Sequence, residues 1–411
     1  MSHSQETHTV SLRAISHIYA GGTPDKKTTR YWENGSIPWV NSGTVNQGLV
    51  TRPSAFISEE AFENSSTSWA RKGDLIVALA GQGQTKGKIA QMGMDACVNQ
   101  SMAVIHIRET SNFVPRFAYY AIHSQYRDIR FMAGGDKRDG LNLQHIGAIR
   151  IPYPPFDTQR RIADYLDRET AEIDGAVADL DKYVELLEKR RRALVHETLV
   201  LRKGPGSGLS IGDSQRGRVG FVTRLLRRGI SPSYVDEGVP VINQKCVRTG
   251  GFLDIASCRF HDSGARNIGL DLTIQPGDTL INSTGTGTLG RSCTVGEISV
   301  PTTWDSHVTL VRPNIDIADP GYLGWTILSQ ESKLVEFSTG STNQIELSRD
   351  TIFNLDFVSI PLDLQKEVSA YLNRETAEID SLIADSTRLR DLLLKRRSVL
   401  ITEVVTGRKQ V

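Results

Sequence analysis

The sequence predicts an α+β protein, in which two mixed, strand-rich domains are joined by two long helices that form an antiparallel coiled coil with pseudo-twofold symmetry. Three observations indicate this fold. Seven residues, RETAEID, occur at 168–174 and again at 374–380, about half of the 411-residue chain apart. A heptad pattern accompanies each copy, and short apolar segments separated by turn residues precede it. The chain is therefore a tandem duplication that imitates a homodimer, which suits a target with two parts.

The two strand-rich domains are expected at residues 1–155 and 219–361. In each, short apolar stretches alternate with clusters of Gly, Asn, Ser and Thr, a pattern typical of strands and turns. Between these stretches the two halves differ strongly. The duplication therefore predicts that the two domains share a framework of strands and differ in their loop sequences. The strands are expected at 36–40, 74–79 and 102–107, and in the second domain at 238–242, 278–281 and 308–311.

The long helices are expected at 156–203 and 362–411, with a linker at 204–218 between the first helix and the second domain. Asp157 is the N-cap candidate of the first helix, and the glycine-rich segment 204–208 and Gly407 are stop signals. Apolar residues at alternating steps of three and four predict a coiled-coil seam. The expected seam residues are Ile173, Val177, Leu180, Val184, Leu187, Leu194 and Leu201 in the first helix, and Ile379, Ile383, Leu389, Leu393, Leu400 and Val404 in the second.

Charge indicates the orientation of the two helices. Both helices are acid-rich in their first half and carry a basic cluster, 189–192 or 395–397, in their second half. Antiparallel packing places acid opposite base and opposes the helix dipoles. Ser386 and Arg390 interrupt the second seam, as Arg191 and Thr198 interrupt the first. The alternative is that each helix packs only on its own domain.

Two glycine-rich loops resemble nucleotide-binding motifs without fulfilling them. Residues 285–290 match G-x-G-x-x-G, but the next segment, 291–295, is typical of a strand where a dinucleotide fold needs a helix. The loop at 81–88 has Gln82 where a P-loop needs glycine. We interpret both as glycine hairpins whose polar side chains contact nucleic acid, with a solvated turn as the alternative. The candidate residues are Gln82, Gln84, Thr85, Lys86 and Lys88 in one loop, and Ser283, Thr284, Thr286, Thr288 and Arg291 in the other.

Further candidates lie in loops where cations are interleaved with Tyr, Asn or Ser, a composition that suits a phosphate backbone. Trp32 and Trp39 are expected to be core residues instead. The loops just before each long helix are a third group, placed alike in both halves. The residues are Lys26, Lys27, Arg30, Asn41, Ser42 and Thr44 with Arg227, Arg228, Ser231, Asn243, Gln244 and Lys245, and in the third group Lys137, Arg138, Asn343 and Gln344.

Composition excludes several classes of function. The net charge is +1, so basicity alone does not indicate a nucleic-acid binder. Four scattered cysteines and nine dispersed histidines predict neither a disulfide framework nor a metal site. No apolar run could span a membrane and no secretion signal is recognisable, so we expect a cytoplasmic protein. Motifs for nucleophilic or metal-dependent catalysis are missing, and we expect no catalytic residues.

The segment PPFDTQRRIADYL at 154–166, the repeated RETAEID and the Gly-Asp pairs before the strands at 74 and 278 resemble the specificity subunit of type I restriction-modification enzymes. The resemblance covers nearly the whole chain. It implies two target recognition domains, each reading one half of a split sequence in double-stranded DNA. The long helices would set the spacing and dock two methyltransferase subunits and the restriction subunits. S-adenosylmethionine, ATP and Mg²⁺ would belong to those partners, and this chain would hold no cofactor.

Two alternatives belong to other classes. A coiled-coil scaffold for protein interactions would show the same duplication without binding DNA. A stand-alone modification enzyme would need a cofactor motif, which the sequence does not contain.

Overall fold

The computed structural model describes residues 8–81, 83–132, 140–199, 215–262, 264, 272–338 and 346–411. The chain divides into two compact units, one made of residues 1–181 and 388–411 and the other of residues 182–387. We call them unit 1 and unit 2. Each unit contains one strand-rich domain and segments of both long helices, so each is described by itself.

Unit 1 is built on a five-stranded sheet of order β2-β10-β7-β8-β4, a four-stranded sheet of order β5-β3-β9-β6 and the two-stranded ribbon β1-β11. Strand β10 is antiparallel to both β2 and β7, whereas β3 runs parallel to β9. The strands are β1 (Thr9–Ser11), β2 (Ser16–Ala20), β3 (Ile37–Val40), β4 (Leu49–Val50), β5 (Ala55–Ile57), β6 (Ser68–Ala70), β7 (Leu75–Ala78), β8 (Ile89–Met92), β9 (Ala96–Val98), β10 (Met102–Ile107) and β11 (Arg150–Pro152).

Unit 2 shares the central part of this topology but differs at the sheet edges, with the order β13-β20-β17-β18 in one sheet, β14-β16-β15-β19 in the other and the ribbon β12-β21. Strands β15 and β19 are again parallel, as β3 and β9 are. The strands are β12 (Gln215–Arg218), β13 (Thr223–Arg228), β14 (Tyr234–Val235), β15 (Val239–Ile242), β16 (Arg259–His261), β17 (Thr279–Asn282), β18 (Ser292–Thr294), β19 (Thr303–Trp304), β20 (Val308–Pro313) and β21 (Asp356–Ser359). All six strands expected from the sequence are present, in β3, β7, β10, β15, β17 and β20.

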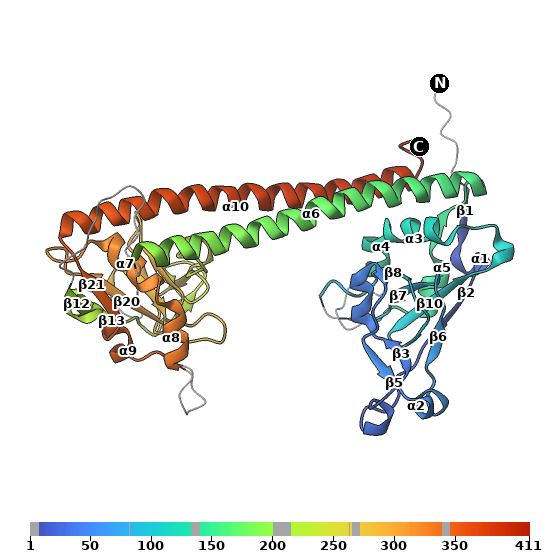
Figure 1. The fold of residues 1–411 in the computed structure, drawn as a ribbon, viewed down its shortest axis with the longest axis horizontal. Helices are drawn as coiled ribbons and strands as arrows, with labels where there is room; N and C mark the ends of the chain where they lie inside the picture. Colours follow the sequence, from blue (N-terminus) through green and yellow to red (C-terminus); the bar gives the residue numbers. More distant parts are fainter. Residues whose placement is uncertain are drawn as a thin grey trace. The chain divides into compact units, whose positions relative to one another are not determined.

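Short helices complete each unit. In unit 1 the helices α3, α4 and α5 lie on the side of the sheets that faces α6, and α2 lies at the opposite end beside β5 (Figure 1). Unit 2 places α7, α8 and α9 at the matching points of the chain. The helices are α1 (Leu12–Ile15), α2 (Glu59–Glu63), α3 (Pro115–His123), α4 (Tyr126–Phe131), α5 (Leu143–Ala148), α7 (Pro320–Leu328), α8 (Glu331–Ser338) and α9 (Arg349–Phe353).

The long helices are α6 (Phe156–Leu199) and α10 (Leu362–Val405). Helix α6 begins one residue before the expected cap, so Asp157 lies in its first turn rather than at the N-cap. A carboxylate there still opposes the positive end of the helix dipole. Residues 200–203 and Leu201, included in the expected first helix, lie outside the described residues.

A buried glutamine ties the start of each long helix to its domain. Gln159 is fully buried, accepts from the Val114 backbone N at 2.9 Å and donates to the Pro154 carbonyl at 2.9 Å. Gln365 repeats this arrangement by accepting from the Asp319 backbone N and donating to two carbonyls at 2.9 and 3.0 Å. Because a buried amide is costly unless it is paired, these bonds fix the angle at which each helix leaves its domain. The glutamine shared by the two repeats is therefore a structural residue.

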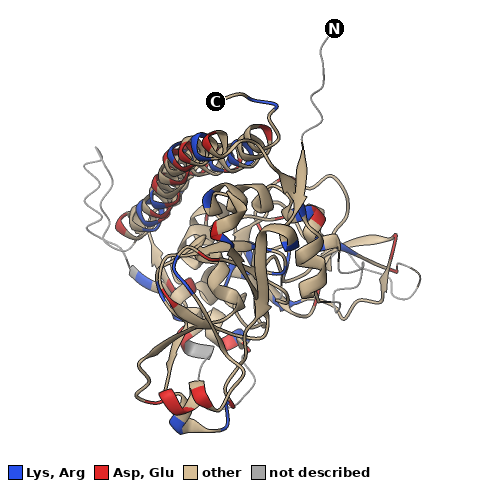
Figure 2. Ribbon diagram, turned by 90° about the vertical axis from the view of Figure 1, so that its right-hand side faces the viewer, with Lys and Arg blue, Asp and Glu red and all other residues tan. Residues whose placement is uncertain are grey.

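The two long helices run antiparallel, as charge predicted, and three ion pairs fix their register. In unit 1, Arg397 pairs with Asp174 at 2.8 Å and Arg390 with Asp181 at 3.2 Å. In unit 2, Arg191 pairs with Asp380 at 2.8 Å. From Asp174 to Asp181 the residue number in α6 rises by seven, while from Arg397 to Arg390 the number in α10 falls by seven. Only antiparallel helices can form pairs in this order. Figure 2 shows acidic and basic residues interspersed along the long helices.

The seam differs from the expected one at one position. Leu389 is 49% exposed and faces away, whereas Ser386 is buried and Arg390 is half-buried in the interface. The prediction that Leu389 is a seam residue was wrong, because the heptad register continues through Ser386 and Arg390 here. Ile173, Leu187, Ile379 and Leu400 are buried. The remaining expected positions, Val177, Leu180, Val184, Leu194, Ile383 and Leu393, are half-buried.

The ends of the long helices also pack on the domains. Ile162 and Leu166 of α6 and Ile401 and Val404 of α10 belong to the same core as Phe117 of α3. Coiled-coil pairing and packing on a domain therefore occur together, and the two alternatives posed by the sequence do not exclude each other. Among the described residues, no helix is both long enough and apolar enough to cross a bilayer.

Candidate nucleic-acid interface

Described segments from three separate parts of the chain come together at one place in unit 2. Strand β17 leads into the glycine loop, β15 leads into Asn243 and Gln244, and the segment before α9 contacts the glycine loop. The Leu347 backbone N donates to the Ser283 carbonyl at 2.8 Å, and Thr284 forms an isolated β-bridge with Glu346. The glycine loop and the segment before α9 are therefore neighbours in space although they are about 60 residues apart in sequence.

A chain of side-chain hydrogen bonds crosses this place. The Gln244 amide donates to the Thr284 hydroxyl, which lies 2.9 Å from Nδ1 of His307. Asn282 donates from Nδ2 to the Gln244 carbonyl at 3.1 Å and so links the two loops through the backbone. His307 is exposed, and no local sequence pattern marks it, because it follows a different strand, β19.

A cation borders the same cluster. Arg228 of β13 pairs with Glu346 and donates to the Leu347 carbonyl at 2.7 Å. Partial burial lowers the pKa of the Arg228 guanidinium, which remains charged because the ordinary pKa of arginine is so high. Arg291 donates to the Gly287 carbonyl at 2.7 Å, and Lys245 is exposed. The loops thus carry positive charge beside polar side chains.

The glycine loop itself is a turn between β17 and β18, as the sequence predicted. Gly285, Gly287 and Gly290 have φ of +103°, +78° and +83°, conformations that side chains with a Cβ rarely adopt. The segment after the loop is strand β18, so the G-x-G-x-x-G match has no helix to bind a dinucleotide. Thr286 is exposed at the tip, and Thr288 is half-buried.

Unit 1 brings its loops together in the same way. Lys88, after the glycine loop, donates to the Asn46 side chain at 2.9 Å, which joins this loop to the segment after β3. Tyr126 of α4 donates to the Gln84 carbonyl at 2.6 Å, and Arg130 donates to the Gly83 carbonyl. Gln84 is exposed and Thr85 half-buried. Tyr126 and Arg130 are residues of this region that sequence reasoning did not identify.

Several predicted residues shape the loops from within. Asn41 and Asn243 occupy equivalent positions, and each accepts from the backbone N two residues later, at 2.8 and 2.9 Å. Thr44 is buried and bonds to Ser54 at 2.8 Å, and Ser283 is fully buried against Thr309. Lys86 is also buried. These contacts hold the turns, and whether the same residues also contact DNA stays a prediction.

The remaining predicted residues are distributed as follows. Lys26, Lys27 and Ser231 are exposed, Ser42 and Arg227 are half-buried, and Arg30 pairs with Glu60 at 3.0 Å. Trp32 and Trp39 pack edge to face with ring centroids 5.1 Å apart, as expected of core residues. Gln82, Lys137, Arg138, Asn343 and Gln344 lie outside the described residues.

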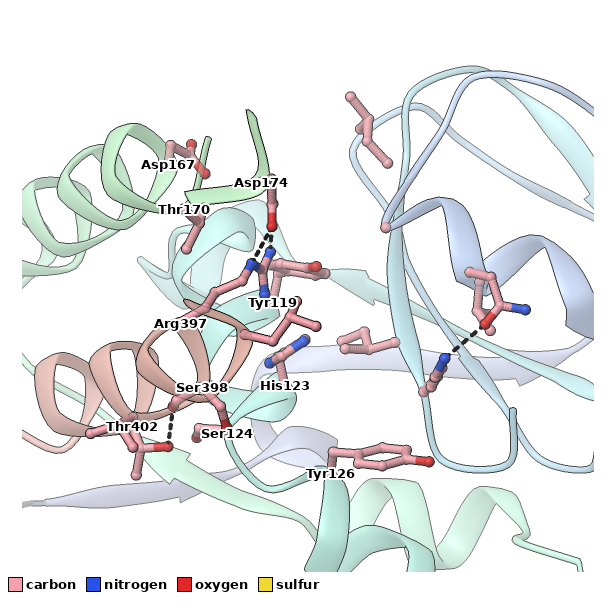
Figure 3. Close-up of a pocket in the computed structure, with 18 of the residues that line it drawn as sticks. Tyr119, His123, Ser124, Tyr126, Asp167, Thr170, Asp174, Arg397, Ser398 and Thr402 are labelled. Carbon is pink, nitrogen blue, oxygen red and sulfur yellow. Dashed lines mark hydrogen bonds and ion pairs between the residues drawn. The ribbon is translucent and has the colours of Figure 1, made fainter. Parts of the chain in front are cut away.

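A groove of about 1060 Å³ separates the domain of unit 1 from its helix pair. Tyr119 and His123 of α3 line it, and the ion pair between Asp174 and Arg397 forms its wall (Figure 3). Burial, followed by the positive charge of Arg397, lowers the pKa of His123 to about 4. Arg116 lies deeper and donates to Asp167 at 2.6 Å.

The corresponding groove of unit 2 is smaller, about 340 Å³. Arg191, the counterpart of Arg397, lies between the rings of Phe252 and Trp325, 5.7 and 5.5 Å from their centroids, and donates to the Gly250 carbonyl at 2.8 Å. Both aromatic residues line this smaller groove.

Within the described ranges, no group of three or more His, Cys, Asp or Glu side chains gathers as it would around a metal ion. The four cysteines are free, and the Sγ atoms of Cys246 and Cys258 lie 3.8 Å apart. The carboxylates of the two Gly-Asp pairs are buried in structural roles, with Asp74 bonded to His106 at 2.7 Å and Asp278 to Arg312 at 2.7 Å.

Comparison with known proteins is consistent with this architecture. Residues 5–176 match the family model described as "Type I restriction modification DNA specificity domain". The chain is 28% identical over 185 residues to the specificity subunit of the type I restriction enzyme EcoR124I/EcoR124II of Escherichia coli, covering 44% of this chain and 45% of that protein. It is 24% identical over 183 residues to the MjaIX specificity subunit of Methanocaldococcus jannaschii, covering 43% and 40%. The matches therefore span less than half the length of these curated relatives.

A solved structure extends the likeness in fold to almost the whole chain. It comes from work described as the "structural basis underlying complex assembly and conformational transition of the type I R-M system". The TM-score is 0.71 over 97% of both chains, at 16% sequence identity. The fold therefore consists of two related strand-rich domains and two antiparallel long helices, with polar and basic loops gathered in each domain. The chain is thus similar to type I restriction-modification specificity subunits, in sequence over residues 5–176 and in fold over almost its whole length.

Proposed function

We propose that this chain is the DNA-recognition subunit of a type I restriction-modification complex. Each unit would read one half of a bipartite target in double-stranded DNA. The observation that carries the proposal is the convergence, in unit 2, of loops from three separate parts of the chain on the Gln244, Thr284 and Arg228 cluster. Cations there would bind phosphates, and the amide and hydroxyl groups would discriminate base edges.

The duplication supports the bipartite target. Both units share the central strand order, β2-β10-β7-β8 with β13-β20-β17-β18 and β5-β3-β9 with β16-β15-β19, and the same Asn-initiated turn after β3 and β15, while the side chains on the turns differ. A shared framework with different reading residues suits two unlike half-sequences. The long helices would set the length of the gap between the two half-sites, which lie roughly 34 Å apart when their centres are one helical turn of DNA from each other.

We further propose that the chain has no catalytic role. Two methyltransferase subunits and the restriction subunits would dock on it and supply S-adenosylmethionine, ATP and Mg²⁺. Chromosomal DNA as the target and thiols that remain unpaired support a cytoplasmic location.

The decisive experiment is methylome mapping after co-expression of the full chain with a cognate methyltransferase subunit. Exchange of residues 1–155 for those of another specificity subunit should change one half of the modified motif and leave the other half unchanged. Modification of a continuous sequence, or a change in both halves, would contradict the proposal. DNA affinity of the complex should also fall steeply with salt, which a pure protein scaffold would not show.

A further inference from the structure

The turn that precedes β10 in unit 1 and β20 in unit 2 has the same backbone in both units. In unit 1, Asn99 accepts through its side chain from the Ser101 backbone N at 3.1 Å. In unit 2, Asp305 accepts from the His307 backbone N at 2.9 Å. The two turns therefore have the same hydrogen-bonded structure. The third residue of the turn is Ser101 in unit 1 and His307 in unit 2.

A second contact holds each turn against its glycine loop. The Ser101 carbonyl accepts from the Leu79 backbone N at 2.8 Å, and the His307 carbonyl accepts from the Ser283 backbone N at 2.8 Å. Leu79 and Ser283 directly follow β7 and β17, where the glycine loops begin. The backbone of the third residue is thus fixed beside the predicted reading loop, and only its side chain distinguishes the two units.

The hydrogen-bond chain in unit 2 favours one tautomer of His307. The Thr284 hydroxyl accepts from the Gln244 amide, so its single hydrogen is available for Nδ1 of His307, 2.9 Å away. Nδ1 is then the acceptor of the ring, and Nε2 carries the hydrogen of the neutral imidazole. His307 is exposed, and no described residue forms a hydrogen bond to Nε2. The ring presents an N–H donor to the surroundings.

The position of this donor suits the edge of a base. Arg228 and Lys245 lie on loops of the same cluster and supply charge for flanking phosphates. In the major groove, guanine offers two adjacent acceptors, O6 and N7, whereas cytosine offers only a donor. A fixed N–H group therefore discriminates between the two bases of a G·C pair.

We infer that His307 is a specificity-determining residue of unit 2, which donates from Nε2 to an acceptor on a base edge, with guanine preferred, in the half-site that unit 2 reads. Thr284 and Gln244 are positioning residues that act through the imidazole. Ser101 occupies the same place in unit 1 with a shorter side chain. This inference rests on the proposed function, because it assigns a role within the same interface.

The test uses the full chain assembled with its methyltransferase partner and the motif that the wild-type complex modifies. His307→Ala should weaken discrimination at one base pair of one half-site by at least about 5-fold, and leave the other half-site unchanged. His307→Gln keeps an N–H group at similar reach and should retain more of the preference. Thr284→Val removes the hydroxyl that sets the tautomer and should relax the same base pair. Ser306→Ala, at the adjacent position of the turn, is the matched control and should leave the motif unchanged.

Discrimination is measured by methylome mapping and by competition binding on duplexes that carry each of the four base pairs at every position. Thermal unfolding of each variant shows that its fold is intact. An unchanged preference in His307→Ala would overturn the inference, and so would an equal loss of affinity on all duplexes, which indicates a phosphate contact or a structural role. If the wild-type complex modifies no bipartite motif, the proposed function itself fails.

Discussion

Acid should destabilise unit 1 through His123, because this histidine is held neutral in the folded state. Burial lowers its pKa from 6.5 to about 4, with a further contribution from Arg397 (Figure 3). Between these two pH values the unfolded chain binds a proton that the folded chain does not. Stability is therefore complete above pH 6.5 and is lost as the pH falls toward 4, at about 1.4 kcal/mol per pH unit. The total is about 3 kcal/mol.

The assay is urea unfolding of the full chain between pH 7.5 and 4, with His123→Gln as the matched variant. Glutamine fills similar space and does not titrate, so the difference in unfolding free energy between the two proteins should shrink or reverse as the pH falls. Titration of the His123 ring followed by NMR gives the pKa directly. Parallel pH profiles for the two proteins, or a ring that titrates near pH 6.5, would refute the reasoning.

Three further changes test the spine and its attachment. Gln159→Leu leaves two buried backbone groups without their hydrogen-bond partner and should lower the free energy of unfolding, measured by chemical denaturation, by about 2–4 kcal/mol. A decrease below about 0.5 kcal/mol would contradict the structural role. Arg191→Ala should cost about 1–3 kcal/mol, whereas the exchanged pair of Arg191→Asp with Asp380→Arg should recover part of it in a double-mutant cycle; an additive cycle would exclude the pairing. Removal of 182–188 together with 383–389 shortens both helices by about 10 Å and should shorten the unread gap of the modified motif by about three base pairs, with both half-sequences unchanged. A gap that stays constant in methylome mapping would show that the helices do not set it.

Much of the fold could be predicted from the sequence because its signals are local or repeated. The strands at 74–79 and 278–281 are short apolar runs bounded by turn residues, and such runs need no knowledge of distant contacts. The antiparallel orientation followed from the charge distribution of two helices that share one sequence pattern. The same reasoning failed at Leu389, because the heptad register there continues through Ser386 and Arg390, whose polar side chains carry no hydrophobic signal.

The candidate interface was only partly predictable, for a different physical reason. The sequence could identify loops rich in glycine and polar residues, but not which of these side chains turn inward. Ser283 is buried against Thr309, whereas Thr286, three residues later, is exposed at the tip. His307 was missed because its neighbours in the cluster come from other strands, and no local pattern marks a single histidine after a buried tryptophan.

The duplicated ion pair explains how one chain can mimic a symmetric dimer. At the offset between the repeats, Asp380 is the counterpart of Asp174, and Arg397 is the counterpart of Arg191. The pair in unit 1, Asp174 with Arg397, is therefore the copy of the pair in unit 2, Arg191 with Asp380. A contact in which each copy supplies the acid to one pair and the base to the other is self-complementary, as in a twofold dimer interface. Duplication of one gene segment could thus preserve the helix contacts without new residues, while the reading loops of each copy were free to diverge.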